Sequence, residues 1–315
     1  MISLLNILCW VHSTHALRSV LVLALSTGVL NLQGQPAWKL QASVLNQEAA
    51  HLATTGNHLQ ALEKYKASFT LDPWSSMYCY DAVSSAIACG DPISANALLS
   101  LGVQHGFDPK TYTGALDLQE HLTSDASIPF RTNWSNDRMT FASTADPALI
   151  EEIIDLAETD QAVRKRNGSA FEEARTDSTN FESLLRIVEK RGFPTPQKVG
   201  LTSGLVWLLL WHHPAPEYPA SGQWLRVLPY IRSAIKAGDL SPSFLCMFED
   251  YSDHEAGRPM RFGTLLGFFQ RTPERLYFID HLTLDRDRAS VGLGPLEWTA
   301  AELGFDLGKV RFAEP

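Results

Sequence analysis

Apolar positions along most of this chain recur at helical spacing, in segments that end at glycine, proline or aspartate. The clearest example covers residues 148–166, where Ile150, Ile153 and Ile154 line one side and Asp146 and Pro147 provide a cap and a first turn. The same patterns predict helices over 179–191, 202–213, 222–237 and 295–303, a short apolar segment at 241–248, and strands at 261–269 and 275–282. We therefore expect a mainly α fold with a small β element near the C-terminus.

A repeat is visible in the first third of the chain, between residues 42–73 and 76–107. Gly56 and Gly90 are 90 − 56 = 34 residues apart, and Ala61 and Ala95 are also 95 − 61 = 34 apart. Each glycine separates two helical patterns, and each alanine allows two helices to approach closely. A helix–turn–helix period of this length resembles the tetratricopeptide repeat family. The resemblance implies either a concave surface that binds a protein or peptide, or a short helical support for the neighbouring domain.

The repeats suggest how the chain is divided into domains. Two repeats alone bury little surface, so we expect a capping helix within residues 109–123 to complete a repeat domain over 38–123. Residues 124–147 lack a helical period and are rich in Ser, Thr, Asn and Asp, which predicts a linker or a long ordered loop. Residues 148–315 would then form a second, mostly helical domain of unknown function.

The first 37 residues have the composition of an export signal. Arg18 is the only Lys or Arg among them, and it precedes an apolar run over residues 19–32. This run of about 14 residues is typical of a signal peptide and shorter than the roughly 20 residues that span a bilayer. We therefore predict an exported protein, periplasmic or extracellular. An uncleaved membrane anchor is the alternative, and membrane contact is expected only through this segment.

Charge and cysteine content narrow the range of functions. The net charge is −9, which argues against a nucleic-acid partner because such proteins concentrate positive charge. Cys9 would leave with the signal, and Cys79, Cys89 and Cys246 are expected to be buried free thiols. The sequence contains no C-x-x-C, Walker loop, G-x-S-x-G or G-x-G-x-x-G motif, so we expect no cofactor.

A second resemblance rests on the order and spacing of six pieces of the second domain. Together they resemble an uncharacterised bacterial domain family for which no reaction is known. The chain departs from that pattern at Tyr251, where an arginine is expected, and at Leu265, where a glutamine is expected. The pieces are "ETDQAVRKR" (158–166), "RGFPTPQKVG" (191–200), "VWLLLWHH" (206–213), "FEDYSD" (248–253), "RFGT" (261–264) and "DRASVGLGPLEW" (287–298).

The resemblance, taken residue by residue, selects polar groups that could form a site. It implies roles for Asp160, Gln161, Arg164, Pro194, Thr195, His212, Asp250, Gly263 and Thr264. If the arginine expected at 251 and the glutamine expected at 265 take part in catalysis in relatives, this chain has lost that activity.

Three of these residues also suggest chemistry without the resemblance. Asp160 and Arg164 are four apart on a helix, so they form either a surface ion pair or a site in which Arg164 clamps an anion. His212 ends an apolar helix; it either binds the last carbonyls or acts as a general base oriented by Asp160 or Asp250. The candidate catalytic set is Asp160, Gln161, Arg164, His212, Asp250 and Thr264.

The segment 249–255 ("EDYSDHE") gathers four carboxylates and a histidine. It could hold a divalent metal together with His212, but it lacks a known metal-binding spacing, so we expect a solvated acidic turn and no metal. Two functions remain. The first, which we favour from sequence, is a protein- or peptide-binding scaffold formed by the repeats. The alternative is a hydrolase- or lyase-type enzyme acting on an anionic substrate, which requires the candidate set to converge in one cleft.

Overall fold

In the computed structural model the structure describes residues 36–112, 114–213 and 218–313, and this part of the chain is mainly α. The predicted signal segment lies outside the described residues except for its last two positions, and Cys9 lies outside them as well. No helix within the described ranges combines the length and apolar character needed to cross a membrane.

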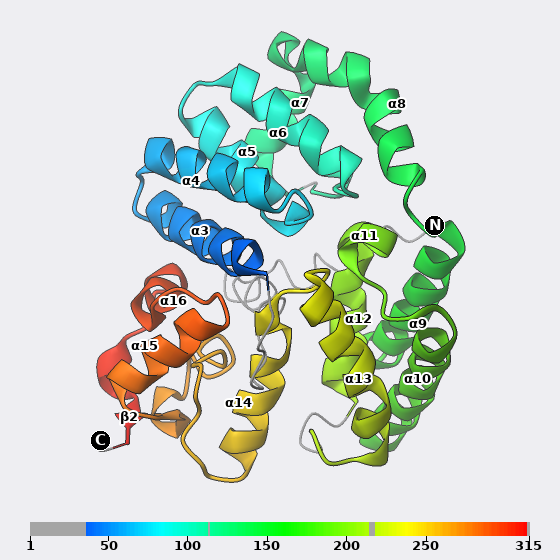
Figure 1. Cartoon of the computed structure of the whole chain (residues 1–315), viewed down its shortest axis with the longest axis vertical. Coiled ribbons are helices and arrows are strands. Elements are labelled where there is room, and N and C mark those ends of the chain that lie inside the picture. Colours follow the sequence, from blue (N-terminus) through cyan, green and yellow to red (C-terminus); the bar gives the residue numbers. More distant parts are fainter. Residues whose placement is uncertain (1–35, 113, 214–217, 314–315) are drawn as a thin grey trace.

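The first four described helices form two antiparallel hairpins at the positions that the 34-residue period predicts (Figure 1). Gly56 and Gly90 adopt φ values of 82° and 68°, a left-handed conformation that ends the first helix of each hairpin. Ala61 and Ala95 have no exposed surface, as expected where two helices cross closely. The helices are α3 (Ala37–Thr54), α4 (His58–Leu71), α5 (Cys79–Ala88) and α6 (Pro92–Gln104).

The prediction of a linker or long loop over residues 124–147 is wrong in its main part, because residues 128–142 form a helix. Helix α7 (Leu116–Thr123) supplies the expected cap and packs against α5, and α8 (Ile128–Ala142) packs against α6. Only Phe130 and Asp137 of α8 are buried, and Gln104 Nε2 donates to Asp137 Oδ1 at 2.7 Å. Because so few positions of α8 are buried, its apolar residues do not recur at helical spacing in the sequence.

The described residues of the predicted second domain contain the remaining helices and a two-stranded parallel sheet, in which Tyr277 pairs with Arg311 and Phe278 with Phe312. The prediction of a strand at 261–269 is wrong, because these residues form bends and turns. The prediction of an acidic turn at 249–255 is also wrong, because these residues belong to helix α14. The elements are α9 (Pro147–Lys165), α10 (Ala170–Arg191), α11 (Pro196–Val199), α12 (Ser203–His212), α13 (Gly222–Ala237), α14 (Cys246–Glu255), β1 (Tyr277–Phe278), α15 (His281–Ser290), α16 (Leu296–Leu303) and β2 (Arg311–Phe312). Short 3-10 helices cover Ser76–Tyr78, Pro109–Thr111, Asp125–Ser127, Gly200–Thr202, Pro242–Leu245, Pro273–Arg275 and Leu307–Lys309.

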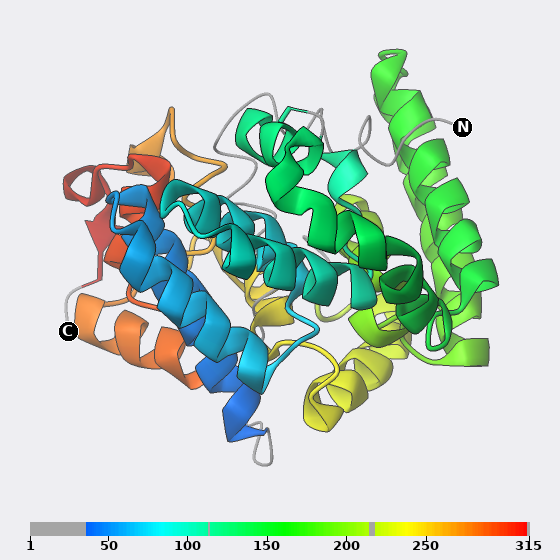
Figure 2. The ribbon, with the colours of Figure 1, turned by 90° about the horizontal axis from the view of Figure 1, so that it is seen from above.

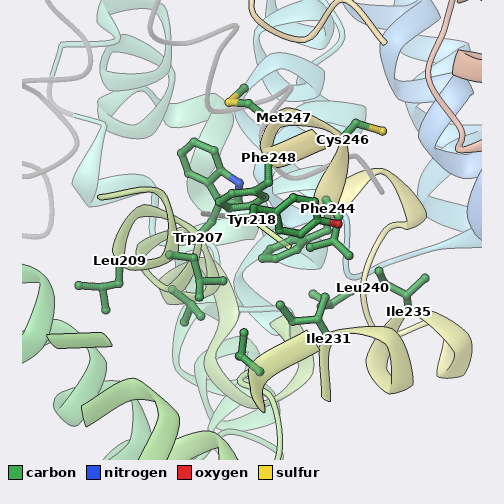
Figure 3. Close-up of a cluster of buried hydrophobic side chains, with 14 of the residues drawn as sticks. Trp207, Leu209, Tyr218, Ile231, Ile235, Leu240, Phe244, Cys246, Met247 and Phe248 are labelled. Carbon is green, nitrogen blue, oxygen red and sulfur yellow. The ribbon is translucent and has the colours of Figure 1, made fainter. Parts of the chain in front are cut away.

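The core of the second domain surrounds α12, whose apolar run is buried on nearly every side. Figure 3 shows side chains of α12, α13 and α14 meeting there, among them Trp207 and Phe248, together with Phe244 of the 3-10 helix before α14. The ring centroids of Trp207 and Phe248 lie 5.8 Å apart. Burial of α12 fixes where the helix ends, and therefore where His212, its last residue, is placed.

No disulfide joins the cysteines of the described residues, as predicted, but not all of these cysteines are buried. Cys79 and Cys246 are buried, whereas Cys89 is exposed near the end of the first hairpin helix of the second repeat. The expectation of three buried thiols was therefore wrong for Cys89.

The first repeat helix is covered on one face by the C-terminal segment, and α3 lies beside α16 in Figure 1. Gln47 Nε2 donates to the carbonyl of Gly292 at 2.8 Å, and its Oε1 accepts from the amide of Gly294 at 2.9 Å. The His51 ring stacks on Trp298 with centroids 5.8 Å apart. This face of the repeats is therefore occupied by the chain itself.

Glu302 of α16, next to this contact, makes the free energy of unfolding of the protein depend on pH. Burial, and then the negative charge of Asp81, raise the pKa of Glu302 to about 8. An unfolded glutamate titrates near pH 4.3, so between that pH and about 8 the folded state holds a proton that the unfolded state has lost. Stability therefore falls as the pH rises through this window, by at most about 1.4 kcal/mol per pH unit from this group.

We expect Glu302→Gln to flatten this pH dependence, because the amide cannot ionise. Urea unfolding of both proteins at several pH values between 5 and 8 measures it. The control is Glu274→Gln, which removes an exposed carboxylate elsewhere in the same part of the chain and should leave the slope of the parent protein unchanged. Equal slopes in the parent and Glu302→Gln would contradict the assignment.

Candidate functional site

The candidate site lies where α9, α10 and α12 meet (Figure 2 shows α9 and α10 side by side in bright green). Helix α9 ends at a turn in which Asn167 adopts a φ of 54°, and a capping box between Ser169 and Glu172 starts α10. This hairpin sets the end of α9 opposite the first half of α10. Four of the six predicted catalytic residues come together here, namely Asp160, Gln161, Arg164 and His212.

Asp160 is the centre of the cluster and has no exposed surface. Its carboxylate accepts from Nδ1 of His212, with Oδ2 at 2.8 Å and Oδ1 at 3.0 Å. It also accepts from Gln161 Nε2 at 2.7 Å and from an Arg164 guanidinium nitrogen at 3.0 Å. A buried carboxylate with three side-chain donors is held in one orientation.

Arg164 is bound on both sides by carboxylates, which corrects the expectation that it clamps an anionic ligand. One guanidinium nitrogen donates to Asp160, and the other donates to both oxygens of Asp177 at 2.9 Å. The Arg164 side chain is 20% exposed. These donors are used within the protein and are not available to hold a substrate.

Asp177 completes the cluster and was missed by sequence reasoning. Burial raises the pKa of Asp177, while the hydrogen bonds and charge of Arg164 act in the opposite direction. Asp177 lies on α10 outside all six motif pieces, and only the packing of α10 on α9 brings it to Arg164. No spacing in the sequence could have signalled it.

His212 has the geometry of an oriented base. A carboxylate can only accept hydrogen bonds, so Nδ1 donates to Asp160 and the neutral ring keeps its lone pair on Nε2. The side chain is 19% exposed. Because its Nδ1 edge faces a fully buried carboxylate, Nε2 lies on the opposite edge of the ring, where we expect the exposure. Within the described ranges no hydrogen bond reaches Nε2.

His213 does not share this environment, although it is the next residue. Its Nε2 lies 2.5 Å from Gln223 Oε1, and its ring packs 4.2 Å from the Phe181 ring centroid. Successive helical residues point about 100° apart, so the two rings were not expected to face one pocket. The pair is one oriented histidine and one core histidine.

Asp250 and Thr264, the other two predicted catalytic residues, form a separate structural clasp. Both are fully buried. Asp250 accepts from the backbone amides of Arg261 and Phe262 at 3.0 Å each, and from the amide and hydroxyl of Thr264 at 2.7 Å each. Burial raises the pKa of Asp250 to about 6. Asp250 therefore holds the turn after α14, and Asp160, not Asp250, orients His212.

The clasp is closed from the other side by Arg288, which is also fully buried. Arg288 donates to the carbonyls of Phe262 and Gly294 and to Thr299 Oγ1. Gly263 adopts a φ of 62° at this point, and a Cβ there would lie 2.5 Å from Leu296 Cδ1. The last three motif pieces thus meet around one turn and have a structural role.

The remaining residues singled out by the resemblance are also packing residues. Thr195 is buried and follows Pro194, and its carbonyl accepts from the amides of Lys198 and Val199 at the start of α11. At the two departures from the family pattern, Tyr251 packs edge-on against Trp211 with centroids 5.1 Å apart, and Leu265 is fully buried.

The cluster also contains a possible ligand set for a metal. Ligand atoms of Asp160, Asp177 and His212 lie within 4.8 Å of one another. However, the Arg164 guanidinium bridges the two carboxylates and supplies the positive charge that an ion would bring. These residues fit an arginine better than a metal, because an ion would have to displace Arg164.

Comparison with family models, curated proteins and solved structures found no match to this chain.

Proposed function

We propose that this chain is an enzyme of the hydrolase or lyase type in which Nε2 of His212 is the general base. The observation that carries the proposal is the contact between His212 Nδ1 and the buried carboxylate of Asp160 at 2.8 Å. This contact fixes the tautomer of the ring and directs its basic nitrogen toward the exposed edge.

Each neighbour of His212 supports proton transfer at that nitrogen. Nε2 accepts a proton from a water or from a substrate carbon, and Asp160 stabilises the imidazolium that forms. Arg164 and Gln161 hold Asp160 through hydrogen bonds of 3.0 and 2.7 Å, and Asp177 holds Arg164. Arg164 and Asp177 are therefore positioning residues in this proposal.

The charge of the cluster changes the kind of substrate we expect. Two carboxylates and one guanidinium sum to −1 when His212 is neutral, and the guanidinium donors are bound to Asp160 and Asp177. The cluster therefore lends no support to an anionic substrate. A neutral or cationic reacting group fits this charge better.

The alternative role, peptide or protein binding through the repeats, has less support. One face of α3 is covered by Gly292, Gly294 and Trp298 of the same chain. The repeats then act mainly as a helical support for the second domain.

The proposal is tested with a panel of chromogenic esters, phosphates and glycosides together with a lyase assay on β-substituted acids. We expect turnover on one class by the parent protein and a loss of about 10²–10⁴-fold in His212→Asn. His281→Asn, which changes an exposed histidine, is the control and should retain full activity. Thermal unfolding of each variant reports whether the fold is intact. Turnover that survives in folded His212→Asn, or no turnover on any class, would contradict the proposal.

A further inference from the structure

We propose that the groove between α6 and α8 binds a small amphipathic anion, namely a medium-chain alkyl carboxylate. The groove is formed where the end of α6 and the segment after it face α8 and the start of α9. Figure 1 shows α8 at the edge of the repeats, leading into α9. None of the residues that line the groove belongs to the cluster around Asp160, so this site is separate from the proposed catalytic one.

The size of the groove suits an alkyl chain. Its volume is about 360 Å³, whereas a cavity of roughly 150 Å³ already holds benzene. The groove is partly open to solvent, so a ligand can enter without a change in the fold.

Most of the lining is apolar. Val103 and Phe107 come from the buried core of the repeats, and Pro147 and Ile150 come from α9. Met139 lines the same groove and is 62% exposed, and its unbranched thioether can adapt to the shape of a ligand. Each CH₂ group that a ligand buries on such a surface should tighten binding about fourfold.

One part of the groove wall is fixed by the close approach of two backbone segments. Gly106 lines the groove, and a Cβ on it would lie 2.7 Å from Cα of Gly200 and 2.9 Å from Cζ of Phe141. The Phe141 ring, which also lines the groove, is therefore packed against backbone that leaves it little room to move. A wall that is formed before binding lowers the entropy cost of association.

Two cations beside the groove indicate an anionic head group. Trp134 lines the groove, and the guanidinium carbon of Arg138 lies 5.7 Å from the centroid of its ring. Lys110 Nζ lies 4.9 Å from the same ring. Both cationic residues are exposed, and neither forms an ion pair within the described part of the chain. Their donors are therefore open to a carboxylate that arrives from solvent.

The two carboxylates nearby are engaged by other groups. Asp108 Oδ1 accepts from the backbone amide of Lys110 at 3.0 Å and caps the 3-10 helix Pro109–Thr111. Asp137 is buried, and its Oδ1 accepts from Gln104 at the end of α6 at 2.7 Å. Neither carboxylate pairs with the exposed guanidinium of Arg138, which leaves that group to the ligand.

The ligand class follows from combining these features. A carboxylate would lie at Arg138 and Lys110, and an alkyl chain on the same molecule would lie along the apolar part of the groove. Octanoate has both groups and is a suitable probe. Octan-1-ol is its uncharged analogue, and octyltrimethylammonium is its cationic analogue.

The full chain is tested by calorimetric titration with octanoate at low salt, below the concentration at which micelles form. We expect saturable binding that is about sixteenfold tighter than that of hexanoate, because octanoate adds two CH₂ groups. Arg138→Gln should weaken binding by about fivefold, since it removes an exposed ion pair. Arg271→Gln, at an exposed arginine far along the chain, should bind as the parent protein does.

A second variant tests the groove itself. Ala142 lines the groove and is exposed, so Ala142→Phe fills the groove without disturbing the core. This variant should keep the Tm of the parent protein and bind octanoate at least about tenfold more weakly, because it prevents burial of about two CH₂ groups. Ala174→Phe, which adds the same ring at an exposed position of α10, is the control.

Several results would overturn the proposal. These are no saturable binding of octanoate, equal binding of hexanoate and octanoate, and octanoate binding no tighter than that of octan-1-ol or octyltrimethylammonium. Unchanged octanoate binding in Arg138→Gln or in folded Ala142→Phe would also reject it.

Discussion

Asp160→Ala is expected to lower the free energy of unfolding by about 3–5 kcal/mol, because it breaks a buried ion pair, leaves His212 Nδ1 without its acceptor and leaves Arg164 with Asp177 as its only carboxylate. The Asp160 side chain is 1% exposed and accepts from three side chains on two helices. Urea unfolding at neutral pH measures the effect. The loss exceeds that of a surface pair, which is worth about 0–1 kcal/mol, because the donors of Arg164 and His212 cannot be fully hydrated where they stand.

Two further variants separate charge from packing. Asp155→Ala removes an exposed carboxylate one and a half turns earlier on α9 and should change stability by less than about 0.5 kcal/mol. Asp160→Asn keeps the shape of the side chain and removes the charge, so its effect should lie between the other two. A loss below about 1 kcal/mol in Asp160→Ala would show that the cluster is looser and wetter than its distances indicate.

Asp250→Ala is the second variant for which we expect a large loss, again about 3–5 kcal/mol. Its carboxylate satisfies three backbone amides and the Thr264 hydroxyl, all in the turn after α14. Each buried donor left without an acceptor costs about 1–3 kcal/mol, partly offset if water enters. Urea unfolding measures the loss, and Glu255→Ala, at an exposed position on α14, is the control.

Asp250→Ala also distinguishes the clasp from the catalytic cluster. Because Asp250 does not contact His212, a folded Asp250→Ala protein should retain the His212 ring geometry of the parent protein. A variant that is as stable as the parent would contradict the clasp, and one that is stable but alters the His212 ring would return Asp250 to the site.

The elements that were predicted well from the sequence have wide apolar faces or residues that clearly mark the start or end of a helix. The helix at 148–166 and the two hairpins were predictable because caps and glycines mark their ends. Helix α8 was not, since it buries only Phe130 and Asp137. Helix α15 was missed for the same reason, as it buries only Leu284 and Arg288.

The candidate site was predictable only in its local part. The pairing of Asp160 with Arg164 follows from helical spacing. The contact of His212 with Asp160 joins residues 52 positions apart, and that of Asp177 with Arg164 joins two helices across a turn. Such contacts depend on how the helices pack, which spacing alone does not determine. The six sequence pieces therefore contain residues of two separate features, which are the polar cluster around Asp160 and the structural clasp around Asp250.

The most direct test of the account is the protonation of the His212 ring, read from NMR signals of its two nitrogens at a pH where the ring is neutral. We predict a proton on Nδ1 and a lone pair on Nε2, with this preference lost in Asp160→Asn. A proton on Nε2 in the parent protein, or a tautomer unaffected by Asp160→Asn, would contradict the role of His212 as a base oriented by Asp160.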